Sequence, residues 1–296
     1  MALADGVRAA CAQIAADARH VRIDIDAMAA LAPAPTPELD PQRHYLDGDS
    51  ADVAAYLLTL NAINFGSGWF PLLRKRASTP GGPTVSGYFT VAWALTDRFR
   101  AEGPWSNAQL RAMTANEIAA VLGQRADLEL MALFAQALRA LGAWLGERGA
   151  LDVIDEAGGS AQRLAAALAG GMAMFADTGF YKRAQIAPHD FALAGIAQFR
   201  DIDELTIFAD NLVPHVLRCA GVLVYDDELA AHIDAERLLP MDRREREIRA
   251  CAVHACEQIA ARDGIPARIL DERLWNHGQS PEIKARPRHR CRTVYY

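Results

Sequence analysis

Cysteine is scarce in this 296-residue chain, which has five, and no two of them form a C-x-x-C pair. An odd number of scattered cysteines indicates neither a disulfide framework nor a zinc ribbon, so we expect reduced thiols in the core. The chain also lacks H-E-x-x-H, G-x-x-x-x-G-K-[ST] and G-x-S-x-G. These absences argue against the commonest zinc peptidase, P-loop and serine hydrolase signatures.

Long apolar runs are missing as well. Residues 131–138 are broken by Gln136 and end before Arg139, far short of the roughly 20 residues that span a bilayer. Asp5 and Arg8 interrupt the segment where a signal peptide needs an apolar core. We therefore expect no membrane partner and no export, and predict a cytoplasmic location.

Basic residues are fewer than acidic ones, 31 against 37, and the net charge is −6. The imbalance is uneven, because residues 284–296 hold five cations and no acid. The first 283 residues therefore carry a net charge of −11. A body of that charge repels a long polyanion, so we expect no duplex nucleic acid as a partner.

Apolar residues recur with a period near 3.6 in residues 3–19, 51–63, 87–100, 128–146 and 245–262. Hydrophobic residues make up 51% of the sequence, enough for a sizeable core. We predict a mainly α protein with at most a few short strands. The prediction is a single helical domain over residues 1–296, of one or two lobes.

Several local signals support these helices. Thr114 and Glu117 have the spacing of a capping box, and Asp242 with Glu245 makes a looser version. Glycines that follow periodic stretches predict helix ends at positions 103, 123 and 149.

Strand-like alternation is confined to residues 21–25 and 222–225, each of which we predict as an edge hairpin. The proline-rich residues 32–41 cannot propagate a helix. Residues 1–50 are therefore predicted as N-terminal helices followed by an extended strap.

Two groups of residues resemble ligand sites only weakly. Cys251 and His254 share a helical face, but Cys256 points elsewhere, so a shared metal ion is not expected. Gly66 and Gly68 resemble half of a dinucleotide loop without its preceding strand. We therefore expect neither a metal nor a cofactor.

Three segments are hard to explain as plain core, and the first is residues 60–71. It is an apolar helix end followed by Asn64, Phe65, Gly66, Ser67 and Trp69. Glycine lets a backbone approach a flat ligand, and aromatic rings stack on one. The alternative is a helix end capped by Gly66, with the rings as core residues.

The second segment, residues 179–190, places Lys182, Gln185 and His189 on one helical face, beside Tyr181 and Asp190. This face would offer hydrogen-bond donors to a polar substrate. The alternative is a solvated helix, although the interleaved apolar residues indicate partial burial.

The third segment, residues 205–218, is an apolar run that stops at Asp210 before a helix restarts near Pro214. Asp210 is predicted to cap this helix by accepting its free N–H groups. A carboxylate held there is also kept ionised and aimed, so a catalytic role is compatible with capping.

The basic run in residues 284–292, which includes His289 and Arg290, could meet a phosphate. The alternative is a disordered tail, although residues 294–296 could dock it on the body. One short basic segment suits a mononucleotide better than a strand.

The phrases NFGSGWFP, FYKRAQ, LTIFADNLVPHVLR, EIRACAVHACEQI, LDERLWNHG and HRCRTVYY occur in this order. Together they resemble the queuosine salvage protein family, from about residue 61 to the end. The resemblance implies a helical fold related to helix-hairpin-helix DNA glycosylases. It also implies hydrolysis of queuosine 5′-monophosphate to queuine and ribose 5-phosphate.

The resemblance implies Lys182 of FYKRAQ and Asp210 of TIFADNLVP as the catalytic pair. Cleavage of an N-glycosidic bond builds positive charge on the sugar, which a fixed carboxylate stabilises. Lys182 would orient the sugar or hold Asp210 ionised. His215 departs from the glutamine that is common in the family.

Other residues are predicted to contact the base, its ammonium side chain or the 5′-phosphate. In chain order they are Asn64, Phe65, Gly66, Ser67, Trp69, Tyr181, Gln185, Asp190, His215, His289 and Arg290.

Two other functions fit the same residues. One is a DNA-repair base glycosylase that uses Lys182 and Asp210, which would need a basic face. The other is a non-catalytic protein that binds queuine or queuosine.

Overall fold

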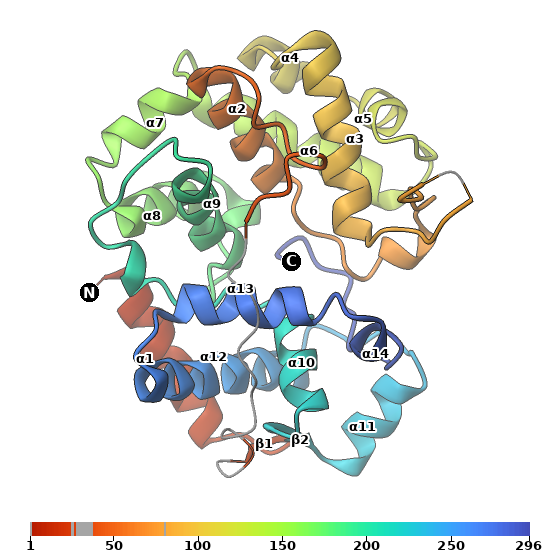
Figure 1. Cartoon of the computed structure of the whole chain (residues 1–296), viewed down its shortest axis with the longest axis vertical. Helices are drawn as coiled ribbons and strands as arrows, with labels where there is room; N and C mark the ends of the chain where they lie inside the picture. The colour runs from red at the N-terminus through yellow and green to blue at the C-terminus, as the bar shows by residue number, and fades with distance from the viewer. Residues whose placement is uncertain (1, 25–26, 28–37, 80) are drawn as a thin grey trace.

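The computed structural model describes residues 2–24, 27, 38–79 and 81–296. Within these ranges it has fourteen α-helices and one two-stranded sheet, which confirms the mainly α prediction (Figure 1). The described helices are also too short or too polar to cross a membrane.

Seven consecutive helices and α9 surround the first hydrophobic core, in the upper half of Figure 1. Phe134 and Leu138 of the long helix α6 are fully buried there. The elements are α2 (Ser50–Ala62), α3 (Gly87–Glu102), α4 (Asn107–Ala112), α5 (Ala115–Val121), α6 (Glu129–Leu145), α7 (Ala150–Glu156), α8 (Ala161–Gly171) and α9 (Lys182–Leu193). The 3₁₀ turns Phe70–Leu72 and Ala173–Phe175 lie between them.

The second core forms around α12, in the lower half of Figure 1, and α1 packs along that helix. Ile248 and Ile259 of α12 are fully buried. The elements are α1 (Leu3–Ala16), β1 (Val21–Ile23), α10 (Val213–Cys219), β2 (Leu223–Tyr225), α11 (Asp227–Asp234), α12 (Arg243–Asp263), α13 (Ala267–His277) and α14 (Pro281–Lys284). A 3₁₀ turn, Ile202–Glu204, lies between α9 and α10.

The capping box at Thr114 is confirmed, since the Thr114 hydroxyl accepts from Glu117 N and Glu117 Oε2 accepts from Thr114 N. The looser box is not formed. Asp242 caps α12 by accepting from Arg244 N, whereas Glu245 is buried and faces Arg249.

The predicted helix ends are partly right. Gly103 and Gly123 have left-handed φ values of 71° and 62° after α3 and α5. Gly149, however, starts α7 as its N-cap, and Gly146 with a φ of 63° ends α6. The left-handed conformation, which glycine adopts at little cost, decides which glycine stops the helix.

The hairpin prediction for residues 21–25 and 222–225 is wrong. β1 pairs with β2 in an antiparallel ladder that aligns Val21 with Tyr225. Each strand supplies the backbone hydrogen-bond partners of the other, because among the described residues neither has a neighbouring strand close in sequence. Residues 32–37 of the predicted strap lie outside the described residues.

The basic tail is docked, as residues 294–296 allowed, and the alternative of a disordered segment is wrong. Its end reaches the centre of the molecule in Figure 1, where Tyr296 is 3% exposed. Gly66 N donates to Tyr296 O at 2.9 Å, and Leu239 N donates to Arg290 O at 2.9 Å. These contacts hold the tail against both halves of the protein.

Candidate active site

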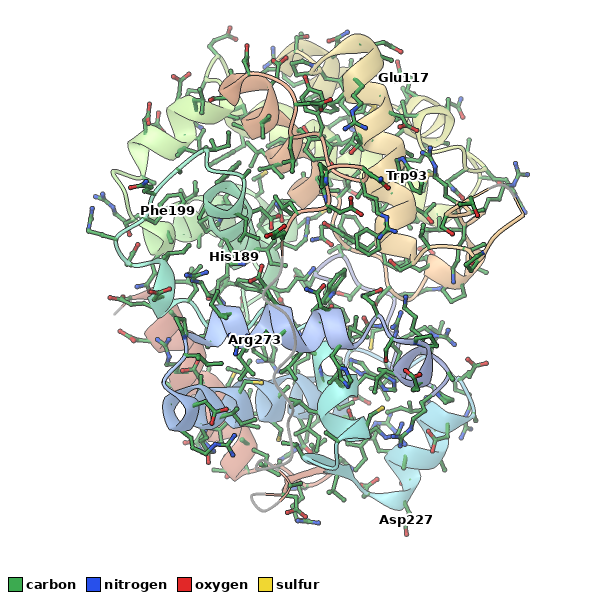
Figure 2. The ribbon with its side chains drawn as sticks, viewed as in Figure 1. Trp93, Glu117, His189, Phe199, Asp227 and Arg273 are labelled. Atoms are coloured by element: carbon green, nitrogen blue, oxygen red, sulfur yellow. The ribbon has the colours of Figure 1, made fainter. Side chains whose placement is uncertain are left out.

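A cavity lies where the two halves meet. Its wall is formed by residues 38–44 and 64–70, the start of α3, one face of α9, residues 208–212 and α13. Figure 2 labels His189, which lies where α9 approaches α13, and its Nε2 is 2.7 Å from Oε1 of Glu272. Segments far apart in the sequence therefore line one cavity.

Asp210 lies on this wall at the start of α10. Its Oδ1 accepts from Leu212 N at 2.6 Å and from Val213 N at 3.0 Å. The predicted capping role is confirmed by these two hydrogen bonds. They fix the carboxylate in one orientation at the start of the helix.

Lys182, the first residue of α9, is 5% exposed and lines the same cavity. Its Nζ donates to Asn64 O at 3.3 Å. Burial lowers the pKa of Lys182 to about 8, while the nearby Asp210 carboxylate opposes that change. The two predicted catalytic residues are thus close enough to interact electrostatically.

Five further carboxyl groups line the cavity, those of Glu38, Asp40, Asp190, Asp271 and Glu272, and burial affects two of them strongly. Burial raises the pKa of Asp190 to about 6, although a hydrogen bond from Asn61 Nδ2 at 2.7 Å favours the charged form. Burial and the Asp210 charge raise the pKa of Asp271 well above its ordinary value. Oδ1 of Asp271 accepts from Phe208 N at 2.8 Å. Burial therefore favours the protonated form of two carboxyls, Asp190 and Asp271, on the wall that also holds Asp210.

Aromatic rings form another part of the wall. Tyr88 and Phe89 meet Trp275 edge to face, with ring centroids 5.7 and 5.6 Å apart. His44 Nε2 lies 3.1 Å from the Tyr88 hydroxyl. This cluster offers a flat ligand apolar surface and ring edges.

A basic groove adjoins the cavity, and Ser67, Phe70, Ser86, Gly87 and Arg288 line both. Its cations are Lys75, Lys284, Arg286, Arg288 and Arg290. Within the described part of the chain, Arg290 pairs with Glu236, whereas Lys75, Lys284 and Arg288 form no ion pair. Uncompensated cations at the mouth of the cavity can bind an anion.

Six of the residues predicted from the sequence line the cavity. They are Asn64, Phe65, Ser67, Lys182, Asp190 and Asp210. His189, which the sequence placed on the same face as Lys182, also lines it.

The other predicted residues lie outside the lining and have identifiable structural partners. Trp69 is buried and donates through Nε1 to Glu129 Oε2 at 2.8 Å. Gln185 is fully buried and bonds to Phe180 O and the Thr206 hydroxyl. Direct stacking by Trp69 and base recognition by Gln185 therefore have no support from these positions.

The backbone explains two more of them. Gly66 has a φ of 110°, and an added Cβ would lie 2.6 Å from Leu130 Cδ1, so only glycine fits this turn. Tyr181 has a left-handed φ of 50° as the N-cap of α9. Both residues shape the turns that carry lining side chains.

Two predicted histidines of the lower half, His215 and His289, are buried. Burial lowers the pKa of His215 to about 4 and that of His289 to about 3. His215 Nε2 lies 3.0 Å from Ile283 O, and the His289 ring packs near Tyr296. Neither ring provides a cation for a phosphate at pH 7, and Arg290 lies in the groove rather than the cavity.

Sequence reasoning missed the lining residues of α3 and α13, including Tyr88, Asp271, Glu272 and Trp275. Asp271 and Glu272 belong to the phrase LDERLWNHG, which resembled the family without suggesting a role. Two adjacent acids and a tryptophan on an amphipathic helix were the available signal.

The family model described as queuosine salvage protein matches residues 43–296. The chain is 31% identical to the queuosine 5′-phosphate N-glycosylase/hydrolase of Sphaerobacter thermophilus over 98% of each chain. Proteins of the same description from Mus musculus and Bos taurus are 28% and 29% identical, over 86% of this chain and 85% of theirs. The order of the sequence phrases and the extent of these matches agree, and the chain belongs to the queuosine salvage protein family.

Proposed function

We propose that this protein hydrolyses the N-glycosidic bond of queuosine 5′-phosphate, releasing queuine and ribose 5-phosphate. The names of its relatives support this substrate. The observation that carries the proposal is the Asp210 carboxylate, fixed by two backbone amides on a cavity wall that also holds buried Lys182.

Asp210 acts on the sugar. As the bond to the base breaks, positive charge develops at the anomeric carbon, and the fixed carboxylate stabilises it without reorganising. It also orients the attacking water, whose oxygen bonds to that carbon while its proton passes to the Asp210 carboxylate and balances the proton that the base takes up. Lys182, which interacts electrostatically with Asp210, orients the sugar hydroxyls.

The leaving base takes up a proton overall. Asp271 is a suitable donor, because burial keeps its carboxyl protonated while Oδ1 is fixed by Phe208 N. Asp190 and Glu272 lie on the same wall and can pair with the ammonium of the queuine side chain.

The 5′-phosphate belongs at the junction of the cavity and the basic groove. Arg288 lines both and is half-buried, which makes its guanidinium the best placed donor. We expect the protein to act in the cytoplasm and to bind no duplex nucleic acid.

The test is release of free queuine from queuosine 5′-phosphate, measured by mass spectrometry. The wild type should release base, and Asp210→Asn should lose 100-fold or more of the rate, because the charge is removed but both amide hydrogen bonds can remain. Asp203→Asn, at an exposed ion pair with Arg268, is the matched acid-to-amide control. It should keep the wild-type rate.

Three results would reject parts of the proposal. Binding of the nucleotide without release would favour a binding protein. Release of a base from DNA alone would favour a repair glycosylase. Undiminished release by Asp210→Asn would remove Asp210 from the chemistry.

A further inference from the structure

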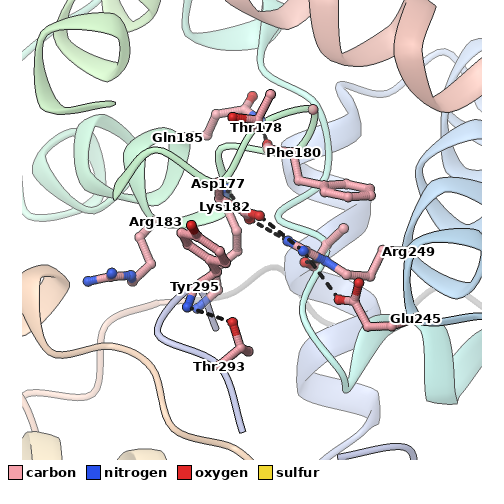
Figure 3. A network of polar contacts seen from close by, with 12 residues as sticks. Asp177, Thr178, Phe180, Lys182, Arg183, Gln185, Glu245, Arg249, Thr293 and Tyr295 are labelled. Carbon is pink, nitrogen blue, oxygen red and sulfur yellow. Dashed lines mark hydrogen bonds and ion pairs between the residues drawn. The ribbon is translucent and has the colours of Figure 1, made fainter. Parts of the chain in front are cut away.

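A buried ion pair outside the cavity lining joins α12 to the turn before α9 (Figure 3). Arg249 is 1% exposed and Asp177 is 4% exposed. The two NH groups of Arg249 contact Oδ1 and Oδ2 of Asp177 at 3.1 and 2.5 Å. This two-point contact fixes the relative orientation of both side chains.

Arg249 also holds the segment that carries Asp210. Its Nε donates to Ala209 O at 2.9 Å, and Ala209 immediately precedes Asp210. The guanidinium packs over the rings of Phe180 and Tyr296, 3.9 and 4.5 Å from their centroids. Aromatic packing and hydrogen bonds together thus fix the position of the Arg249 guanidinium.

Asp177 holds the turn that carries Lys182. Its backbone oxygen accepts from Phe180 N and Tyr181 N at 2.9 and 2.7 Å. Its Oδ2 lies 3.5 Å from Lys182 N, which donates to it. Asp177 therefore fixes the left-handed turn at Tyr181 from which α9 begins.

We propose that Arg249 and Asp177 are positioning residues that set the placement of Asp210 relative to Lys182. The chain of contacts runs from the Asp210 backbone through Ala209 O, Arg249 and Asp177 to the Lys182 backbone. The inference rests on the proposed function, which assigns chemistry to the two ends.

A role in folding alone does not require this arrangement. A buried ion pair is often no more stable than apolar residues of the same volume, because both charges lose their hydration. Here all three guanidinium nitrogens of Arg249 donate hydrogen bonds. NH1 and NH2 donate to Asp177, and Nε donates to the backbone carbonyl of Ala209, next to Asp210. Lysine could keep the charge but could not make these directed contacts together.

The test compares Arg249→Lys and Asp177→Asn with Glu245→Gln. Glu245 is the control because its Oε1 lies 3.4 Å from Arg249 NH1 in the same buried network (Figure 3). Among the described contacts, its side chain bonds to neither segment. Arg249→Lys and Asp177→Asn should each lower kcat tenfold or more with KM within threefold, since a small displacement of a reacting group acts mainly on the transition state. Glu245→Gln should keep kcat within twofold.

Amide hydrogen exchange supplies a readout that does not depend on activity. The amides of Leu212 and Val213, bonded to Asp210, should exchange at least tenfold faster in Arg249→Lys and at the wild-type rate in Glu245→Gln. If Arg249→Lys does not fold, Asp177→Asn, which preserves shape, decides the question by the same two measurements.

The inference is overturned if folded Arg249→Lys or Asp177→Asn keeps wild-type kcat and amide exchange, or if Glu245→Gln matches their losses. A wild type that does not release queuine would reject the proposed function instead. In that case the exchange measurement still tests whether Arg249 orders the Asp210 segment.

Discussion

Replacing Lys182 with methionine should make the protein more stable and less active. Burial lowers the pKa of Lys182 from an ordinary 10.5 to about 8. This difference corresponds to about 3 kcal/mol of folding free energy lost at pH 7, because the charge is favoured more in the unfolded chain. Methionine is of similar length, carries no charge, and would remove that cost. Loss of the hydrogen bond to Asn64 O takes back about 1 kcal/mol, so we expect a net gain of about 2 kcal/mol.

The gain should depend on pH in one direction. Between the folded and unfolded pKa values the unfolded chain binds more protons, so wild-type stability rises with pH there. The cost of the buried charge is complete below about pH 8 and disappears toward pH 10.5. At pH 9.5 about 1.4 kcal/mol of it remains, which the lost hydrogen bond nearly cancels. The advantage of Lys182→Met should therefore be close to zero at that pH.

Urea unfolding at pH 7 and pH 9.5 measures both values. Lys75→Met is the control, because Lys75 is exposed and should change the unfolding free energy by less than about 0.5 kcal/mol at either pH. Queuine release by Lys182→Met should fall at least tenfold. A variant that is less stable than the wild type at pH 7, or an advantage that is the same at both pH values, would refute the buried-charge reasoning.

Two further substitutions separate structural residues from substrate contacts. Trp69→Phe should cost about 1–2 kcal/mol in thermal or urea unfolding, because the hydrogen bond to Glu129 is lost, while queuine release stays within twofold. A tenfold fall in the rate of queuine release by a folded Trp69→Phe variant would instead indicate that Trp69 contacts the substrate. Arg288→Gln should raise KM for queuosine 5′-phosphate about tenfold and leave cleavage of unphosphorylated queuosine unchanged, as steady-state kinetics on both substrates would measure. Equal effects on both would place the phosphate elsewhere.

Local signals in the sequence predicted the helices well, because periodicity and capping act over a few residues. The five predicted periodic stretches correspond to α1, α2, α3, α6 and α12. The strand pair β1 and β2 could not be predicted, since the partners are about 200 residues apart and only the folded second core brings them together. The correction at Gly149 has a local origin instead, because a helix start and a helix stop both use glycine.

The candidate site was predictable only where chemistry and local structure coincide. Asp210 stands out in the sequence as an acid at a helix start, and the two amide bonds confirm that position. Lys182 and Gln185 share a predicted helical face, yet Lys182 lines the cavity and Gln185 turns to Thr206. Periodicity cannot tell which neighbour a buried polar side chain finds, since that depends on segments brought together by folding.

The acidic body and the basic tail of the sequence meet at the cavity and its adjoining groove. Acids at positions 190, 271 and 272 line the cavity but not the adjoining groove. The docked tail contributes Arg288 where the two spaces meet. A small nucleotide with an ammonium on its base and a phosphate on its sugar would be attracted by opposite charges at its two ends, which favours one orientation in the site. In that orientation its glycosidic bond lies between the two charged regions, where Asp210 and Lys182 line the wall. A long polyanion would gain from the groove but would be repelled by the acidic body, so we expect the same charge pattern to favour a mononucleotide over a duplex.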